Sequence, residues 1–173
     1  MHRWFIALLI AIGASNAWSQ SAPLPLEHLL WSGKAIPFYG TPSSEESRQL
    51  LALVREGNLA ERMASFTQGR MRLRHNLAVG FQDCGSPNAF YKPANREIVI
   101  CTEFIKHLTG LLIERKAFFA EQPPEVIGQW LLGSLWVVYL HELSHALIDL
   151  NQVAITGREE DVADQFAICA SPH

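Results

Sequence analysis

The sequence predicts one α+β domain, in which a small sheet is followed by three helices. Short apolar runs bounded by turn residues occupy the region between residues 31 and 101, as is typical of strands. Longer segments of helical period follow them, and no internal repeat or second domain is apparent. The length of 173 residues suffices for one domain with its own hydrophobic core.

Two elements are expected before residue 60. The run Trp31–Tyr39 contains a short strand that ends near Gly40. Ser44–Gly57 has apolar residues at helical spacing and a glycine at its end, so it predicts an amphipathic helix. The side chains expected to face inward are Leu50, Leu51 and Val54.

The strands of the sheet are expected between residues 70 and 101. Arg70–Gln82 is predicted to be extended, while Ala89–Tyr91 and Glu97–Cys101 predict two strands separated by turn residues. Three arginines at alternate positions are expected on one solvated strand face, without a function: Arg70, Arg72 and Arg74.

Three helices are expected after residue 101. Thr102–Phe119 has an apolar side at helical spacing, and residues 125–150 contain no proline but follow two. Apolar residues cover nearly the whole circumference of this second helix before His141, so we expect it to be central and buried. Gly157–Ala167 has an apolar face at helical spacing and predicts the third helix.

The second helix carries His-Glu-Leu-Ser-His at residues 141–145. His141 and His145 are four residues apart, so they lie on one helix face and can hold one metal ion between them. Glu142 lies beside them, where a carboxylate can take a proton from water held by the ion. The alternative is two surface histidines, or a buried histidine bonded to a carbonyl. The burial expected here favours the metal, since unpaired polar groups are costly inside a protein.

A third ligand is suggested by residues 160–164, Glu-Asp-Val-Ala-Asp, which resemble the Glu-x-x-Ala-Asp arrangement of the gluzincin metallopeptidases. The resemblance implies that Glu160 binds zinc. It also implies that Asp164 accepts the second ring N–H of a ligand histidine, which we expect to be His141.

Two further carboxylates flank Glu160. Glu159 and Asp161 are about 100° away from it around a helix, so both are expected to face solvent. Glu159 is the next candidate for the third ligand. Without the upstream histidines, this acidic run would be interpreted as a solvated helix start.

Four blocks of sequence together resemble the bacterial metallopeptidases known as domain of unknown function 4344. They are Cys-Gly-Ser-Pro-Asn-Ala-Phe-Tyr at 84–91, Ile-Val-Ile-Cys-Thr-Glu at 98–103, the histidine block and Glu-Glu-Asp-Val-Ala-Asp at 159–164. The resemblance spans roughly residues 70–168. It implies a zincin-like fold, with a mixed sheet whose edge holds an extended peptide beside the zinc ion.

The chain departs from this family pattern at two places. Thr102 stands where an aromatic residue is expected, and the chain ends at His173, sooner than the family pattern does. We therefore expect a domain shortened at its C-terminus, which affects activity more than zinc binding.

The first residues predict export. A basic start, an apolar run over Trp4–Ile12 and a small-x-small site at Ser15–Ala17 describe a signal peptide over residues 1–19, with the domain over 20–173. The alternative is an N-terminal core helix. The expected location is the periplasm or the exterior. No stable membrane span is expected after cleavage, because the apolar stretch Val126–Leu140 is short and interrupted by Gln129.

Export permits disulfides, and Cys84 and Cys101 are the expected pair because both lie in or beside strands of one hairpin-like region. Cys169 is left over. Cysteine ligation of zinc is the alternative use, although the spacings match no thiolate pattern.

Together these features predict a metalloendopeptidase with one zinc ion that hydrolyses peptide bonds in peptide or protein substrates. One alternative is a catalytically inactive zinc-binding envelope protein, against which the intact Glu142 argues. Another is a secreted disulfide-bonded domain without metal, which would keep His141, His145 and Glu160 apart. The net charge of −3 and the lack of a basic cluster exclude a nucleic-acid partner.

Overall fold

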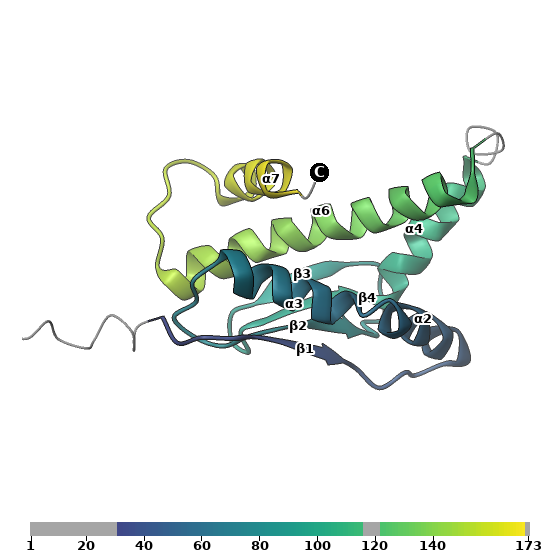
Figure 1. Cartoon of the computed structure of the whole chain (residues 1–173), viewed down its shortest axis with the longest axis horizontal. Helices are drawn as coiled ribbons and strands as arrows, with labels where there is room; N and C mark the ends of the chain where they lie inside the picture. The colour runs from purple at the N-terminus through teal and green to yellow at the C-terminus, as the bar shows by residue number, and fades with distance from the viewer. Residues whose placement is uncertain (1–30, 116–121, 172–173) are drawn as a thin grey trace, which may run out of the picture.

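The computed structural model describes residues 31–115 and 122–171, and it confirms the α+β class (Figure 1). The predicted signal peptide lies outside the described residues. The helices and strands follow one another as β1 (Ala35–Tyr39), α2 (Glu45–Glu56), α3 (Leu59–Arg70), β2 (Leu77–Gln82), β3 (Ala89–Lys92), β4 (Glu97–Cys101), α4 (Thr102–Glu114), α6 (Pro124–Asn151) and α7 (Glu159–Ala170).

The four strands form one mixed sheet in the order β1-β2-β4-β3. The strands β1, β2 and β4 are parallel to one another, and β3 is antiparallel to β4. The mixed sheet implied by the family resemblance is therefore present. In the described part of the chain β3 has only one neighbouring strand, so its other edge can approach an extended chain.

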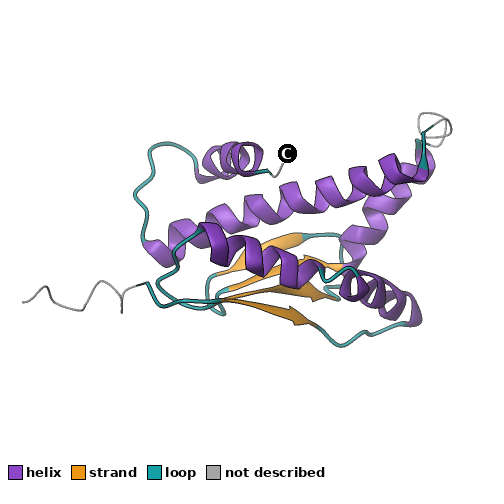
Figure 2. Cartoon of the chain, in the orientation of Figure 1, coloured by secondary structure: helices purple, strands orange, loops and turns teal. Residues whose placement is uncertain are grey.

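The hydrophobic core lies between one face of the sheet and the helices α3 and α6. Alternate residues of the two central strands point to this face and are fully buried. They are Leu77, Val79, Phe81, Ile98 and Ile100. Figure 2 shows α6 beyond this face of the sheet and α7 on the far side of α6. The order of layers is therefore sheet, α6 and α7. One side of α6 contacts the sheet, and another side contacts α7.

The helix α3 has no counterpart among the predicted elements, and it corrects the prediction for Arg70–Gln82. Arg70 is the last residue of α3, and only Leu77–Gln82 form a strand. The three arginines consequently do not share a strand face. Buried residues at helical spacing, such as Leu59, Met63 and Phe66, are the sequence signal for α3.

The helix α6 is less buried than its composition predicts. From Leu135 onward, one side of it packs into the core, but Val126, Trp130 and Val137 are 38%, 38% and 44% exposed. The N-terminal end of α6 extends past the sheet beside α4 (Figure 1), so few elements can cover it. By length and composition alone, Glu125–Asn151 could also cross a membrane, with a mean hydropathy of 1.3 in its most apolar window.

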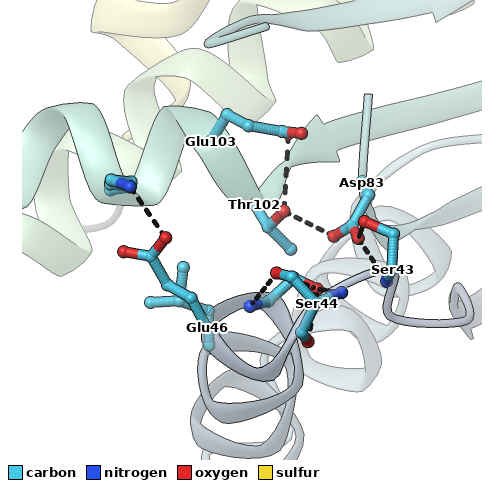
Figure 3. A pocket seen from close by; sticks show the side chains of 9 residues that line it. Ser43, Ser44, Glu46, Asp83, Thr102 and Glu103 are labelled. Atoms are coloured by element: carbon cyan, nitrogen blue, oxygen red, sulfur yellow. Dashed lines mark hydrogen bonds and ion pairs between the residues drawn. The ribbon is translucent and has the colours of Figure 1, made fainter. Parts of the chain in front are cut away.

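A polar network joins the start of α2 to the start of α4 (Figure 3). Asp83 accepts hydrogen bonds from the Ser43 N–H at 2.7 Å and the Thr102 hydroxyl at 2.6 Å. Glu103 accepts from the N–H groups of Cys84 and Gly85, at 3.1 Å and 2.7 Å. Burial alone would raise the pKa of Asp83, but the hydrogen bonds outweigh it and lower the pKa to about 2.

The low pKa of Asp83 predicts a specific loss of stability in acid. Its folded-state pKa lies below the ordinary aspartate value of 3.8, so its contribution to stability is complete above about pH 4 and is lost as the pH falls through about 2. At pH 7, Asp83→Asn should lower the free energy of unfolding by about 1–2 kcal/mol, and this deficit should shrink towards pH 2. Urea unfolding of both proteins from pH 7 to pH 2 measures the difference. A deficit that is the same at both ends, or is reproduced by the exposed Asp161→Asn, contradicts the prediction.

The predicted cysteine pair, Cys84 and Cys101, forms a disulfide, with its Cα atoms 5.5 Å apart. It links the loop after β2 to the end of β4. In the chain-entropy picture, a bridge across 17 positions stabilises the fold by about 3 kcal/mol. Cys169 is free and exposed on α7.

Candidate metal centre

The two histidines of α6 lie one turn apart on the side that faces α7. The Nε2 atoms of His141 and His145 are 3.2 Å from each other. The neighbouring side chains Leu140 and Leu143 are fully buried in the core. Because these leucines are buried in the core, the histidines lie on the side of the helix that faces α7.

The helix α7 brings Glu160 to the histidines. Gly157 has φ 104°, a conformation that suits glycine, and it lies in the connection that returns the chain along α6. Glu160 Oε2 lies 3.2 Å from His141 Nε2 and 3.7 Å from His145 Nε2. Two donors that are each about 2.0–2.1 Å from a tetrahedral ion are about 3.3 Å apart, so the three atoms fit a single metal ion.

The second nitrogen of each histidine is held by a carboxylate. His141 Nδ1 lies 2.9 Å from Asp164 Oδ1, and His145 Nδ1 lies 2.6 Å from Glu159 Oε1. Each carboxylate accepts a hydrogen bond from the Nδ1–H that it contacts, so a ring that is neutral in this position has its lone pair on Nε2. The carboxylates thereby select the tautomer that a metal requires.

When both rings are neutral, three lone-pair acceptors converge without a hydrogen between them. Two Nε2 atoms and one oxygen of Glu160 would repel one another, and a cation among them removes the repulsion. The donor set of two imidazoles and a carboxylate is one that catalytic zinc sites use. The chemistry of the residues present therefore fits a metal ion.

Glu159 is exposed, as expected, but it also contacts the metal centre. It is the first residue of α7, and its side chain reaches His145. Helical period alone does not predict this contact. The start of α7 lies beside His145, so residues on adjacent sides of its first turn both reach the histidines. Asp161 is likewise exposed, as expected.

Glu142 lies beside the histidines and is held by the edge strand. The Tyr91 N–H donates to Glu142 Oε2 at 2.8 Å. Burial raises the pKa of Glu142, while the bond from Tyr91 and the nearby histidines act in the opposite direction. A carboxylate that is half-buried beside a metal centre, with a raised pKa, is suited to accept and return a proton.

Tyr91 and Asp149 are two residues of the site that the sequence analysis does not identify. The Tyr91 hydroxyl donates to Asp149 Oδ2 at 2.6 Å, so β3 is tied to α6 at two points. Asp149 shares a helix face with Glu142 and His145, at spacings of seven and four residues. That spacing is the signal that could have revealed it.

A second cluster of candidate ligands in the described chain involves Cys84, Cys101 and Glu103. The two thiols are joined in the disulfide, and Glu103 accepts from backbone N–H groups. Cysteine ligation of zinc, the alternative use considered above, is therefore excluded for this pair as bonded here.

The mixed sheet, the helix with paired histidines and the following helix with a carboxylate form a zincin-like α+β fold. The chain belongs to the family named domain of unknown function 4344, described as "Putative metallopeptidase", whose sequence profile matches residues 39–171. No curated protein and no solved structure matches the chain. Family membership supports a peptidase role, a metal ion as cofactor and peptides or proteins as substrates.

Proposed function

We propose that the protein is an exported zinc-dependent endopeptidase, with His141, His145 and Glu160 as the ligands of one zinc ion. The observation that carries the proposal is the convergence of the three lone-pair atoms within 3.2–3.7 Å of one another, beside Glu142. Asp164 and Glu159 hold the two ligand rings in their metal-binding tautomer.

The protein's own residues supply the proton transfers. When bound, zinc lowers the pKa of a water molecule towards about 7 and polarises the peptide carbonyl. Glu142 takes the proton from that water as it attacks the carbonyl carbon, and then returns it to the leaving amine nitrogen. The Tyr91 N–H keeps one oxygen of Glu142 in place throughout.

The substrate would lie along β3 as an added strand. The outer edge of β3 passes the metal centre, because Tyr91 of this strand contacts Glu142. Cavities open on both sides of the histidines, so a chain can extend in both directions from the cleaved bond. This open arrangement supports an endopeptidase.

Two features support export. The N-terminal sequence has the three parts of a signal peptide, and the fold contains a disulfide, which persists in oxidising compartments. A periplasmic or secreted peptidase is consistent with both.

Removal of the metal tests the proposal. Cleavage of a denatured protein should be abolished by a zinc chelator and restored by added zinc but not by magnesium, because the donor set includes two imidazoles. Mass spectrometry of the products should show internal cleavage. Cleavage that continues at full rate in metal-free protein contradicts the proposed function.

A further inference from the structure

Two cavities flank the metal centre along the edge strand β3. The first, here called the apolar cavity, has a volume of about 450 Å³ and includes His141 and Glu142 in its wall. The second, here called the acidic cavity, has a volume of about 440 Å³ and includes His145. The cavities therefore lie on opposite sides of the position where the proposed peptidase would cleave its substrate.

The apolar cavity has an apolar wall outside the metal centre. Beside Asn88 and the carboxylate of Asp164, its side chains are Ala89, Phe104, Val137, Val138, Ala167 and Ile168. Two of them, Val137 and Ile168, remain 44% and 71% exposed. An apolar substrate side chain in this cavity would remove that surface from water. Burial of apolar surface favours binding by about 25 cal/mol per Å².

Each cavity is lined by two carboxylates, Asp149 and Glu159 in the acidic cavity and Glu142 and Asp164 in the apolar cavity. Asp149 differs from the other three, because it is neither the proposed base nor a contact of a ligand histidine. Each carboxylate of the acidic cavity uses one oxygen within the protein: Asp149 Oδ2 accepts from the Tyr91 hydroxyl, and Glu159 Oε1 contacts His145. In the described part of the chain, no lysine or arginine lines either cavity, and Arg96, whose charge reaches Tyr91, lies outside the wall. A cationic side chain is the electrostatic complement of the acidic cavity.

The free edge of β3 offers few hydrogen bonds to a substrate. The register with β4, in which the Cys101 N–H bonds to the Asn88 carbonyl, turns the backbone groups of Ala89 and Tyr91 outward. Both outward N–H groups are already used, by Asn88 Oδ1 and by Glu142. Two outward carbonyls remain, so side-chain cavities must provide much of the selectivity.

The direction of β3 sets the order of the two cavities along a substrate. From Ala89 to Tyr91, the strand runs from the apolar cavity towards the acidic cavity. A chain added in the more stable antiparallel direction runs the opposite way, so it meets the acidic cavity first.

We propose that the site selects peptides with a lysine or arginine before the cleaved bond and a large apolar residue after it. This inference rests on the peptidase function proposed above. Asp149 and Glu159 would recognise the cation, while Phe104, Val138 and Ile168 would enclose the apolar side chain.

Four peptides that differ only at two central residues test the inference: Lys-Leu, Ser-Leu, Lys-Ser and Leu-Lys. Cleavage is measured by mass spectrometry with the zinc-loaded protein, and binding by fluorescence anisotropy with zinc-loaded Glu142→Gln. The Lys-Leu peptide should be bound and cleaved about ten-fold better than either serine peptide, with Leu-Lys the poorest. Equal values, or a preference for Leu-Lys, overturn the inference.

Matched variants assign each preference to its cavity. Ile168→Glu should remove the preference for leucine, and Asp149→Asn should remove the preference for lysine while still accepting from Tyr91. Ile113→Glu is the control for Ile168→Glu, because Ile113 is 69% exposed, Ile168 is 71% exposed, and Ile113 lines neither cavity. Asp161→Asn is the control for Asp149→Asn, because Asp161 also lines neither cavity. Loss of preference in these two controls overturns the assignment.

The two readouts separate this inference from the proposed function. Selective binding of Lys-Leu without cleavage supports the inference and overturns the peptidase function. Cleavage of all four peptides at equal rates supports the peptidase function and overturns the inference. Absence of both binding and cleavage overturns both.

Discussion

Glu142→Gln is expected to abolish peptide cleavage and to leave the metal in place. Glutamine has nearly the same shape and can still accept the hydrogen bond from Tyr91, but its amide cannot take a proton from water. General-base catalysis contributes about 10²–10⁴-fold, so cleavage should fall by at least about 10²-fold. Metal content by mass spectrometry and cleavage rate are measured on the same preparation.

Asp161→Asn provides the control for Glu142→Gln, because it removes an exposed carboxylate close to the metal centre. It should keep both metal and activity. Equal cleavage by the wild type and Glu142→Gln would eliminate Glu142 as the base. Full metal content without cleavage in either protein would favour the inactive zinc-binding alternative.

The second large effect expected is the loss of zinc affinity in Glu160→Gln. Glu160 Oε2 is the only carboxylate oxygen in the described chain that lies near both Nε2 atoms, at 3.2 Å and 3.7 Å. Its replacement removes a charged ligand, so zinc affinity should fall by more than about 100-fold. Glu159→Gln only weakens the support of His145, for which about 10–100-fold is typical. Competition with a zinc-binding dye measures both affinities.

The comparison of these two variants decides between the two candidates for the third ligand. A larger loss in Glu159→Gln than in Glu160→Gln would make Glu159 the ligand and Glu160 its neighbour. Thermal unfolding with and without zinc provides an independent measurement, because a ligand that binds the folded state raises its stability. Unfolding of either variant in the absence of zinc would expose a folding defect.

Much of the fold was predictable because local signals dominate it. Ser44 and Gly57 bound α2 as the sequence predicts, with the Ser44 side chain accepting from the Ser47 N–H. The strand Glu97–Cys101 and the histidine helix were likewise apparent from apolar runs between turn residues and prolines. The spacing of His141 and His145 also predicts their shared helix face, because it depends on helix geometry alone.

Features that depend on tertiary placement were not predictable. The contact between Tyr91 and Glu142 joins residues 51 positions apart, and it exists because β3 forms the sheet edge beside α6. Helical period correctly predicts that Glu159 is exposed, but its contact with His145 depends on where α7 begins over α6. The exposure of Trp130 similarly reflects the end of the sheet and not the composition of the helix.

The way β3 is tied to α6 has a consequence for the behaviour of the protein in concentrated solution. An open strand edge invites pairing with a second copy and is a common start of aggregation. Here the edge is only four residues long, both of its outward N–H groups are engaged, and Pro93 follows its last residue. The same contacts that hold Glu142 leave only carbonyl acceptors on this edge, so two copies of it would face each other without a donor, whereas a substrate strand brings its own N–H groups. Tyr91→Pro removes the N–H that donates to Glu142, so Glu142 would lose this hydrogen bond. The substitution would add no donor to the edge.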